Sequence, residues 1–217
     1  LMPIDLNEDG SFMSIIEKLI YQIVKAGISE IFIVVNYRQE LIKDYLGNGE
    51  RYNVRFEYIF QDILDGNGGA FYRCQNKIGN EDVLIADCDN YLSNDNFINN
   101  LKLKHEQNKA DLTIGVSRVK NITKYAIIKV DENLNPLDIY EKPVDRKQWG
   151  NVAKTGVMIL SNKLANMDKS ISMIESSTTK EAYTTTQIVK HCLMHPDLLK
   201  TQICFVDGFF HDTGTWG

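Results

Sequence analysis

The stretch LIADCDNYL, residues 84–92, passes from an apolar run to two carboxylates within three positions. Together with Val83, residues 84–86 are typical of a strand buried in a parallel sheet. Asp87 and Asp89 follow where such a strand would end. Ligands of open α/β sheets bind beyond the carboxyl ends of the strands. The stretch therefore predicts a core strand and, directly after it, a ligand site.

The D-x-D spacing of Asp87 and Asp89 has two interpretations. On an extended backbone both side chains would lie on one side and could face one ligand. Carboxylates are hard oxygen ligands that suit Mg²⁺ or Mn²⁺, which also take oxygens from substrate phosphates. Alternatively, the aspartates start an Asx-type turn, helped by Asn90. The pattern alone favours neither interpretation.

Helical and extended patterns alternate through the first half of the chain. Apolar residues recur with helical spacing over residues 12–24, with Ser11 as the expected N-cap and Gly27 as the expected stop. Further strands are predicted at residues 31–35, 54–60, 83–86 and 112–116, and helices at about 39–46, 70–77 and 96–107. This alternation predicts an α/β sandwich with right-handed crossovers.

The alternation of helical and extended patterns ends in the second half of the chain. YAIIKVDENLNPLDIYEKP, residues 125–143, predicts two short strands joined by a turn. A strand at residues 156–160, helical segments between about 162 and 195, and a strand at 203–206 follow. The sequence has no internal repeat and no Pro/Gly/Ser-rich linker, so we expect a single domain over residues 1–217 with a mixed sheet.

Composition excludes several classes of function. The 217 residues are 43% hydrophobic, enough to bury a core, and the net charge of −5 comes without a Lys/Arg-rich run. Nucleic acid and membranes are therefore poor candidate partners, and no apolar segment approaches the roughly 20 residues of a membrane span. Four cysteines lack C-x-x-C spacing, which predicts reduced thiols and a cytoplasmic protein.

Three other stretches are ambiguous when taken singly. QDILDGNGGAF, residues 61–71, places three glycines before a helix, whose N–H groups could face an anion or a base edge; an ordinary flexible loop is the alternative. YEKPV, residues 140–144, could be solvated surface. FFHDTGTWG, residues 209–217, offers Asp212 but could be a polar turn. His191 and His195 lack an H-E-x-x-H frame, so we do not expect them to bind metal.

The order of these stretches resembles the sugar-1-phosphate nucleotidylyltransferase family, the NDP-sugar pyrophosphorylases. The matching features, in chain order, are Gln61 with Gly66, Gly69-Ala70, Asp89-Asn90, Glu141-Lys142-Pro143, Thr155-Gly156 and Asp212-x-Gly214-Thr215. They span nearly the whole chain. The resemblance implies a three-layer α/β/α sandwich with a mostly parallel mixed sheet, the GT-A or Rossmann-like nucleotide-diphospho-sugar transferase fold.

The resemblance also implies roles for residues. Residues 1–116 would form the nucleotide-binding half, with Gln61 reading the base edge, Gly66 lying against the base, and Asn67 and Asp87 beside them. Residues 117–217 would form the sugar-phosphate half, with Glu141, Lys142, Thr155 and Gly156 holding the acceptor. Asp89 and Asp212 would bind Mg²⁺, with Mn²⁺ as an alternative, and would be catalytic together with Lys142.

The implied reaction is in-line attack by a sugar-1-phosphate oxygen on the α-phosphorus of a nucleoside triphosphate, releasing pyrophosphate. Such catalysis depends on positioning and charge stabilisation. The implied partners are these two substrates, and a homo-oligomer is compatible with them. Neither the base nor the sugar is identified, and another phosphorylated acceptor, such as phosphocholine, stays open.

The sequence departs from the family pattern in three places. Cys88 stands where the family has glycine, and Trp216 replaces a proline. The family's glycine-rich G-x-G-T-R loop and first strand would precede residue 1. We therefore expect the chain to be a fragment that lacks both.

Two other functions remain alternatives. A GT-A glycosyltransferase would use Asp87 and Asp89 as a D-x-D metal site, although it would not require Gln61, Gly66 and the E-K-P residues together. A catalytically silent nucleotide-binding module of the same fold is the second alternative, and the expected absence of the loop favours it.

Overall fold

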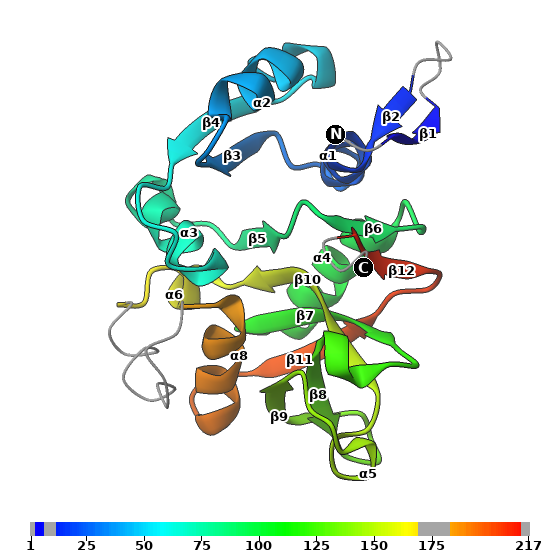
Figure 1. Ribbon diagram of the computed structural model, residues 1–217. Coiled ribbons are helices and arrows are strands. Elements are labelled where there is room, and N and C mark those ends of the chain that lie inside the picture. Colours follow the sequence, from blue (N-terminus) through cyan, green and yellow to red (C-terminus); the bar gives the residue numbers. More distant parts are fainter. Residues whose placement is uncertain (1–2, 7–11, 169–182, 214–217) are drawn as a thin grey trace.

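The computed structural model describes residues 3–6, 12–168 and 183–213 (Figure 1). The described helices are α1 Ile15–Lys25, α2 Gln39–Leu46, α3 Asn67–Cys74, α4 Phe97–Asn108, α5 Arg146–Trp149, α6 Asn162–Ala165 and α8 Thr185–Met194. The strands are β1 Pro3–Leu6, β2 Phe12–Ser14, β3 Glu30–Val35, β4 Arg55–Phe60, β5 Val83–Ala86, β6 Asn90–Leu92, β7 Leu112–Arg118, β8 Ala126–Val130, β9 Pro136–Glu141, β10 Val152–Leu160, β11 Thr201–Phe205 and β12 Phe210–Asp212. None of these helices is long and apolar enough to cross a membrane.

The central sheet is mixed, as expected, but its pairings are mainly antiparallel. Its path is β11-β7-β10-β8-β9, and β5 pairs with β10 off this path. Strand β10 is antiparallel to β5, β7 and β8, whereas β11 is parallel to β7. The prediction of a mostly parallel sheet is therefore wrong, because β10 inserts between β5 and β7, two strands that run in the same direction.

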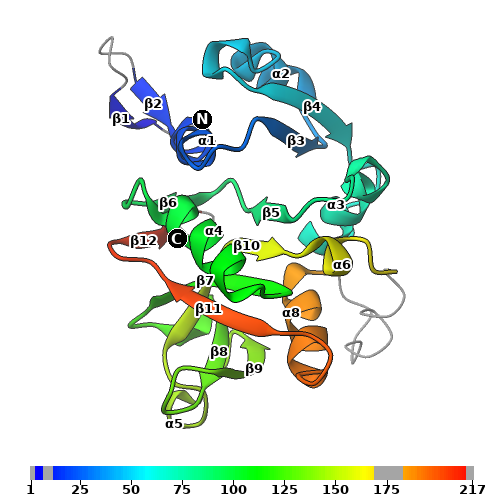
Figure 2. The ribbon, with the colours of Figure 1, turned by 180° about the vertical axis from the view of Figure 1, so that it is seen from behind.

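Helices cover both faces of this sheet (Figures 1 and 2). Alternate residues of β10 point to opposite faces, as the pleat of a strand requires. Met158 and Leu160 pack in a cluster with α3 and α8, whereas Val157 and Ile159 pack with α1 and α4. The expected three-layer α/β/α arrangement follows from this alternation.

A second, smaller sheet lies beside the first. Strands β3 and β4 are parallel, and their apolar residues pack with α1 and α2. Among the described strands, β3 pairs only with β4, and β5 pairs only with β10. Each of these strands therefore has one edge to which no described strand is bonded.

Most predicted elements are present, and two have the predicted bounds. Strand 83–86 and helix 39–46 match β5 and α2, and the hairpin is β8–β9. Helix α3 begins at Asn67 rather than near residue 70. Strands β1, β2, β6 and β12 and the short helix α5 were not predicted.

Helix α1 begins three residues later than its apolar spacing predicts. Residues 12–14 form β2, which pairs with β1, and Ser14 is the N-cap. The Ser14 side chain accepts a hydrogen bond from Glu17 N, and Ser14 N donates the second capping-box bond to Glu17 Oε2. The expected cap, Ser11, lies outside the described residues. Gly27, with φ of +81°, follows the helix end as expected.

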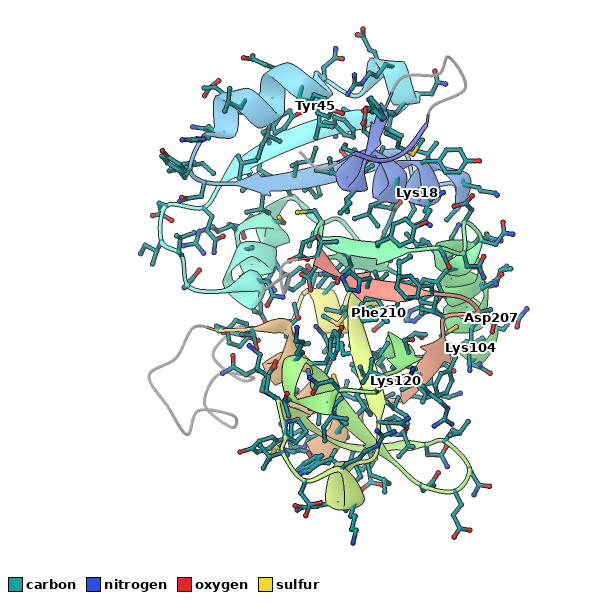
Figure 3. All side chains as sticks on the ribbon, turned by 45° about the vertical axis from the view of Figure 1, so that its right-hand side comes forward. Lys18, Tyr45, Lys104, Lys120, Asp207 and Phe210 are labelled. Carbon is teal, nitrogen blue, oxygen red and sulfur yellow. The ribbon has the colours of Figure 1, made fainter. Side chains whose placement is uncertain are left out.

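Glu17 joins α1 to the elements that follow it. Its carboxylate accepts hydrogen bonds from Tyr45 of α2 (2.5 Å), which is labelled in Figure 3, and from Tyr52 (3.1 Å). It also forms an ion pair with Arg51 at 3.3 Å. Burial raises the pKa of Glu17, but the hydrogen bonds from Ser14, Tyr45 and Tyr52 outweigh burial, so the pKa is lowered overall.

We predict that Glu17→Gln lowers the free energy of unfolding by about 2 kcal/mol at pH 7. A carboxyl group with a lowered folded-state pKa stabilises the fold above its unfolded pKa and loses this effect as pH falls through the folded value. The difference between wild type and variant should therefore be full above pH 4.5 and shrink below it. Denaturant unfolding from pH 3 to pH 7 measures this. Glu40→Gln is the control, because Glu40 is exposed; a pH-independent difference for Glu17→Gln would contradict the prediction.

Candidate active site at the carboxyl end of β5

The backbone turns immediately after β5, and the turn makes Asp87 and Asp89 different. Asp87 N donates to Gly156 O (3.0 Å), and one Asp87 carboxylate oxygen accepts from Asn67 Nδ2 (3.1 Å). Cys88 and Asp89 form the turn that leads into β6, and both are exposed. The backbone therefore turns at residues 88–89, and the metal interpretation stays a prediction. Asp87 is half-buried and held at two points, whereas Asp89 reaches solvent.

The Asp87 side chain packs against the backbone of Gly156. Its φ of +74° is a conformation that other residues rarely adopt, and the register of β10 against β7 shifts at this point. A Cβ atom on Gly156 would lie 2.5 Å from Asp87 Oδ2 and 2.4 Å from Asn90 Nδ2. Only glycine therefore allows the two side chains to approach β10 this closely.

Thr155, the residue before Gly156, is directed into the core. It is fully buried, and its hydroxyl donates to Gly115 O at 2.9 Å. Gly115 lacks a side chain at the point where the hydroxyl approaches, since a Cβ there would lie 2.7 Å from Thr155 Oγ1. The structure thus separates Thr155 from the carboxylates of the β5 end.

Strand pairing brings the two predicted metal ligands together. Strands β6 and β12 are antiparallel, and Asp212 is the register partner of Asn90, the residue after Asp89. Thr213 donates to Asp89 O through its backbone N–H (3.0 Å) and its hydroxyl (2.7 Å). Phe210, labelled in Figure 3, is buried and anchors β12 in the core. The backbone of Asp212 therefore lies beside the turn that holds Asp89.

Asn67 links three elements. It is the first residue of α3, and Gly66 precedes it with φ of +93°. The Asn67 side chain donates to Asp87 and accepts from Thr185 N at the start of α8 (2.9 Å). Both the nitrogen and the oxygen of the Asn67 side-chain amide are thus hydrogen-bonded within the protein.

The glycines of α3 serve close packing. Gly68 N and Gly69 N donate to Tyr183 O at 3.1 and 3.4 Å. A Cβ on Gly68 would lie 2.5 Å from the Tyr183 ring, and one on Gly69 would lie 2.0 Å from the Asp65 carboxylate. The N–H groups of Gly68 and Gly69 therefore bond the carbonyl of Tyr183 and are not open to a ligand.

Gln61 holds the loop between β4 and α3. It is buried, and its side-chain nitrogen donates to Asp65 Oδ1 (2.9 Å) and Gly66 O (3.1 Å). Arg73 of α3 forms ion pairs with Asp62 and Asp65 of the same loop. The loop that carries Gly66 is thus fixed at both ends.

Glu141 is the last residue of β9 and Lys142 follows it, and both are exposed. The Glu141 carboxylate accepts a hydrogen bond from Thr186 Oγ1 at 2.5 Å. Lys142 has φ of +49°, which costs a residue with a side chain about 1 to 2 kcal/mol. The surrounding structure must offset this strain.

The start of α8 is the part of the site that the sequence did not predict. Thr185 bonds Asn67, and the next residue, Thr186, bonds Glu141. The T-x-x-Q pattern of residues 184–187, which forms a capping box here, is the sequence signal that could have indicated a helix start.

Charge at the turn is negative. The pKa of the Cys88 thiol is raised, first by desolvation within the turn and then by the charges of Asp89 and Asp87. The Cys88 residue is itself exposed. In the described part of the chain, no group of three or more His, Cys, Asp or Glu side chains could hold a metal ion. A cation site would therefore depend on Asp89 and on the pairing that places Asp212 beside it.

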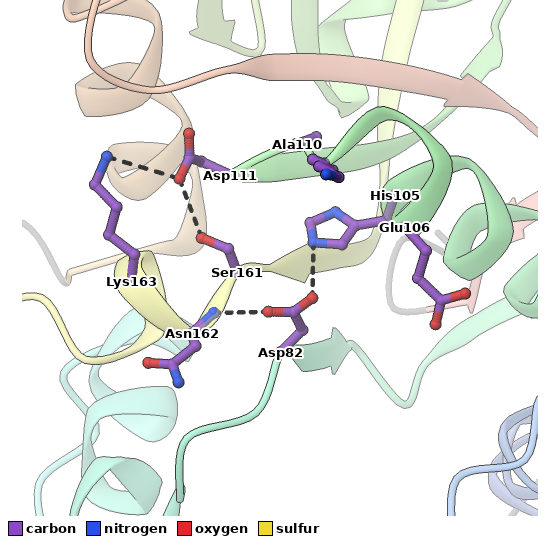
Figure 4. A pocket seen from close by; sticks show the side chains of 9 residues that line it. Asp82, His105, Glu106, Ala110, Asp111, Ser161, Asn162 and Lys163 are labelled. Atoms are coloured by element: carbon purple, nitrogen blue, oxygen red, sulfur yellow. Dashed lines mark hydrogen bonds and ion pairs between the residues drawn. The ribbon is translucent and has the colours of Figure 1, made fainter.

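A separate hollow of about 420 Å³ lies at the opposite end of β5 (Figure 4). It is lined by Asp82, His105, Glu106, Lys109, Ala110, Asp111, Ser161, Asn162 and Lys163. Asp82 accepts from Asn162 N (2.8 Å) and lies 3.4 Å from His105 Nε2. None of the predicted site residues lines this hollow.

Comparison with known proteins gives a consistent result. The family model described as nucleotidyl transferase matches residues 8–217. A glucose-1-phosphate thymidylyltransferase of Neisseria gonorrhoeae is 29% identical over 148 residues, which are 67% of this chain and 50% of that protein. A D-glycero-alpha-D-manno-heptose 1-phosphate guanylyltransferase of Campylobacter jejuni is 23% identical over 190 residues, covering 88% of this chain and 76% of that one.

Solved structures share the fold. An apo UDP-glucose pyrophosphorylase superposes with a TM-score of 0.75 at 18% identity, covering 92% of this chain and 81% of that chain. The expected nucleotide-sugar transferase fold is confirmed. The chain spans about half the length of the first curated relatives it matches.

We predict that Gly156→Ala lowers the free energy of unfolding by about 3 kcal/mol, because the new methyl group meets Asp87 and Asn90 in addition to the backbone strain. Gly150→Ala is the matched control, since Gly150 has φ of +77° but nothing within 4 Å of an added Cβ. The control should lose less than Gly156→Ala, because only its backbone, with φ of +77° and ψ of −142°, is strained. Denaturant unfolding measures both. Equal losses would show that the approach of Asp87 to Gly156 has no energetic importance.

Proposed function

The chain belongs to the nucleotidyl transferase family, and from this premise we propose that it couples a nucleoside triphosphate to a sugar-1-phosphate, giving an NDP-sugar and pyrophosphate. The observation that carries the proposal is the pairing of β6 with β12 beside the end of β5. This pairing places the backbone of Asp212, from the second half of the chain, beside the turn that carries Asp89, at the edge where α/β sheets bind ligands.

Asp89 and Asp212 are the residues that we propose hold Mg²⁺, for which Mn²⁺ could substitute. Carboxylate oxygens suit these ions, and Asp89 is exposed at the turn after β5. A bound divalent cation would offset the charge of the α-phosphate. Asp87 is bonded to Asn67 and packed against Gly156, and we propose that it supports the site without contacting the ion.

The division of the chain into two substrate-binding halves is part of the proposal. In residues 1–116 we assign the base to the loop from Gln61 to Gly66. Gln61 fixes this loop through Asp65, so the Gly66 backbone can lie against a base. We assign Asn67 to the nucleotide half as well, where its bond to Asp87 links the loop to the carboxylates.

Residues 117–217 supply the acceptor site. Glu141 can accept hydrogen bonds from sugar hydroxyls, and Lys142 can offset the charge of the sugar phosphate. Gly156 lies in β10, next to Asp87. The buried hydroxyl of Thr155 supports that strand from the core side. The sugar-1-phosphate oxygen then attacks the α-phosphorus in line, and positioning and charge supply the rate enhancement.

A GT-A glycosyltransferase with an Asp87/Asp89 metal site is less well supported. Asp87 is already bonded to Asn67 and packed on Gly156, and the backbone turns between the two aspartates. We also propose a cytoplasmic location. Cys74, Cys88, Cys192 and Cys204 are unpaired, and burial raises the pKa of Cys74 to about 11, which suits stable reduced thiols.

We predict that the natural full-length protein releases pyrophosphate with at least one pair of nucleoside triphosphate and sugar-1-phosphate when Mg²⁺ is present. The measurement is a pyrophosphate-release screen of the four common triphosphates against a panel of sugar-1-phosphates, with phosphocholine included. Release with no pair would refute the proposed function.

Variants of Asp89 and Asp212, assayed with a substrate pair that gives pyrophosphate release, test the assignment of these two residues as metal ligands. Asp89→Asn and Asp212→Asn should each lower turnover by about 10²-fold or more, because each removes charge that holds the cation. Asp207→Asn is the control, since Asp207 is exposed in the loop before β12. Near-normal turnover in either test variant would remove that residue from the metal site.

The variant Lys142→Gly tests the role of the Lys142 charge, because it removes the ammonium group without adding backbone strain. We predict that it lowers kcat/KM by about 10²-fold, because the ammonium group is lost. The free energy of unfolding should change by less than about 1 kcal/mol, since glycine adopts a positive φ without strain. Lys109→Gly is the matched control: Lys109 has φ of +48° at the end of α4, in the wall of the distant hollow. Unchanged kcat/KM in Lys142→Gly would exclude a role for the ammonium group.

A further inference from the structure

Thr186 and Glu141 form a close contact between α8 and the end of β9. The hydroxyl oxygen of Thr186 lies 2.5 Å from Glu141 Oε1. Thr186 is 8% exposed, whereas Glu141 is exposed. A buried, conformationally fixed donor therefore holds one oxygen of a carboxylate that otherwise reaches solvent.

The donor is fixed because the first turn of α8 is fixed. Thr184 N donates to Gln187 Oε1 (2.6 Å) as part of the capping box, and Thr185 N donates to Asn67. Ile188 and Val189, one turn further on, are buried in the core. The position of the Thr186 hydroxyl is thus set by the helix cap, by α3 and by the core together.

The same carboxylate would be mobile without this contact. Glu141 is the last residue of β9, and Lys142 immediately leaves the strand with a positive φ. An exposed glutamate at a strand end can occupy several rotamers, and fixing it during binding costs free energy. A bond to Oε1 fixes the carboxylate and leaves Oε2 able to accept from a ligand hydroxyl.

We propose that Thr186 is a positioning residue that orients Glu141 toward the sugar-1-phosphate. This inference rests on the proposed function. Thr186 acts through Glu141 without contacting the substrate, and its effect falls on acceptor binding. Because Thr185 bonds Asn67, the same helix turn also joins the acceptor site to the nucleotide half.

Steady-state kinetics of the natural full-length protein test this role. We predict that Thr186→Val raises the KM for the sugar-1-phosphate about tenfold, because the orienting hydrogen bond is lost. The KM for the nucleoside triphosphate should change less than about twofold. Thr186→Ser keeps the hydroxyl and should restore the sugar-1-phosphate KM to within about threefold of wild type. Denaturant unfolding verifies that each variant is folded.

Asp138→Asn is the matched control. Asp138 forms an ion pair with Lys190 between the same strand and the same helix, away from Glu141. Its loss should leave both KM values unchanged. The inference is overturned if Thr186→Val leaves the sugar-1-phosphate KM unchanged, if Thr186→Ser fails as Thr186→Val does, or if Asp138→Asn raises that KM equally. A wild-type protein inactive with every substrate pair overturns the proposed function, and this inference with it.

Discussion

The approach of Asp87 to the backbone of Gly156 is the contact on which the candidate site depends. It requires a glycine with positive φ in the middle of β10, and it ends β5 with a bond from Asp87 N to Gly156 O. The chain then turns, and the turn directs Asp89 to solvent and Asn90 into β6. Since β6 is the strand to which β12 binds, the position of Asp212 also follows from this contact.

The start of α8 has the corresponding role between the two halves of the chain. Consecutive residues of its first turn bond Asn67, in the first half, and Glu141, in the second. Tyr183, just before the helix, takes the N–H groups of Gly68 and Gly69. Three short segments are therefore held to one another by backbone and side-chain hydrogen bonds, and a shift in any one of them would move the groups of both halves.

Local features of the sequence predicted much of the fold, but pairings between distant segments were not predictable. Strand β5 and helix α2 have the bounds that apolar pattern alone indicates. The apolar spacing predicts a start for α1 that is too early, because Phe12 fits helical spacing although it belongs to β2. No local sequence pattern predicts the pairing of β6 with β12, because each strand has only three residues and the two strands lie far apart in the chain.

Glycine and aspartate patterns show why site residues are harder to predict than elements. A cluster of glycines before a helix can indicate a ligand or close packing, and here Tyr183 and Asp65 occupy the space that side chains at Gly68 and Gly69 would need. In the same way, the D-x-D spacing does not reveal whether the backbone stays extended. The turn at Cys88 and Asp89 separates a structural aspartate from an exposed one. The distinction arises because Gly156 and Asn67 bind Asp87, and neither residue is near it in the sequence.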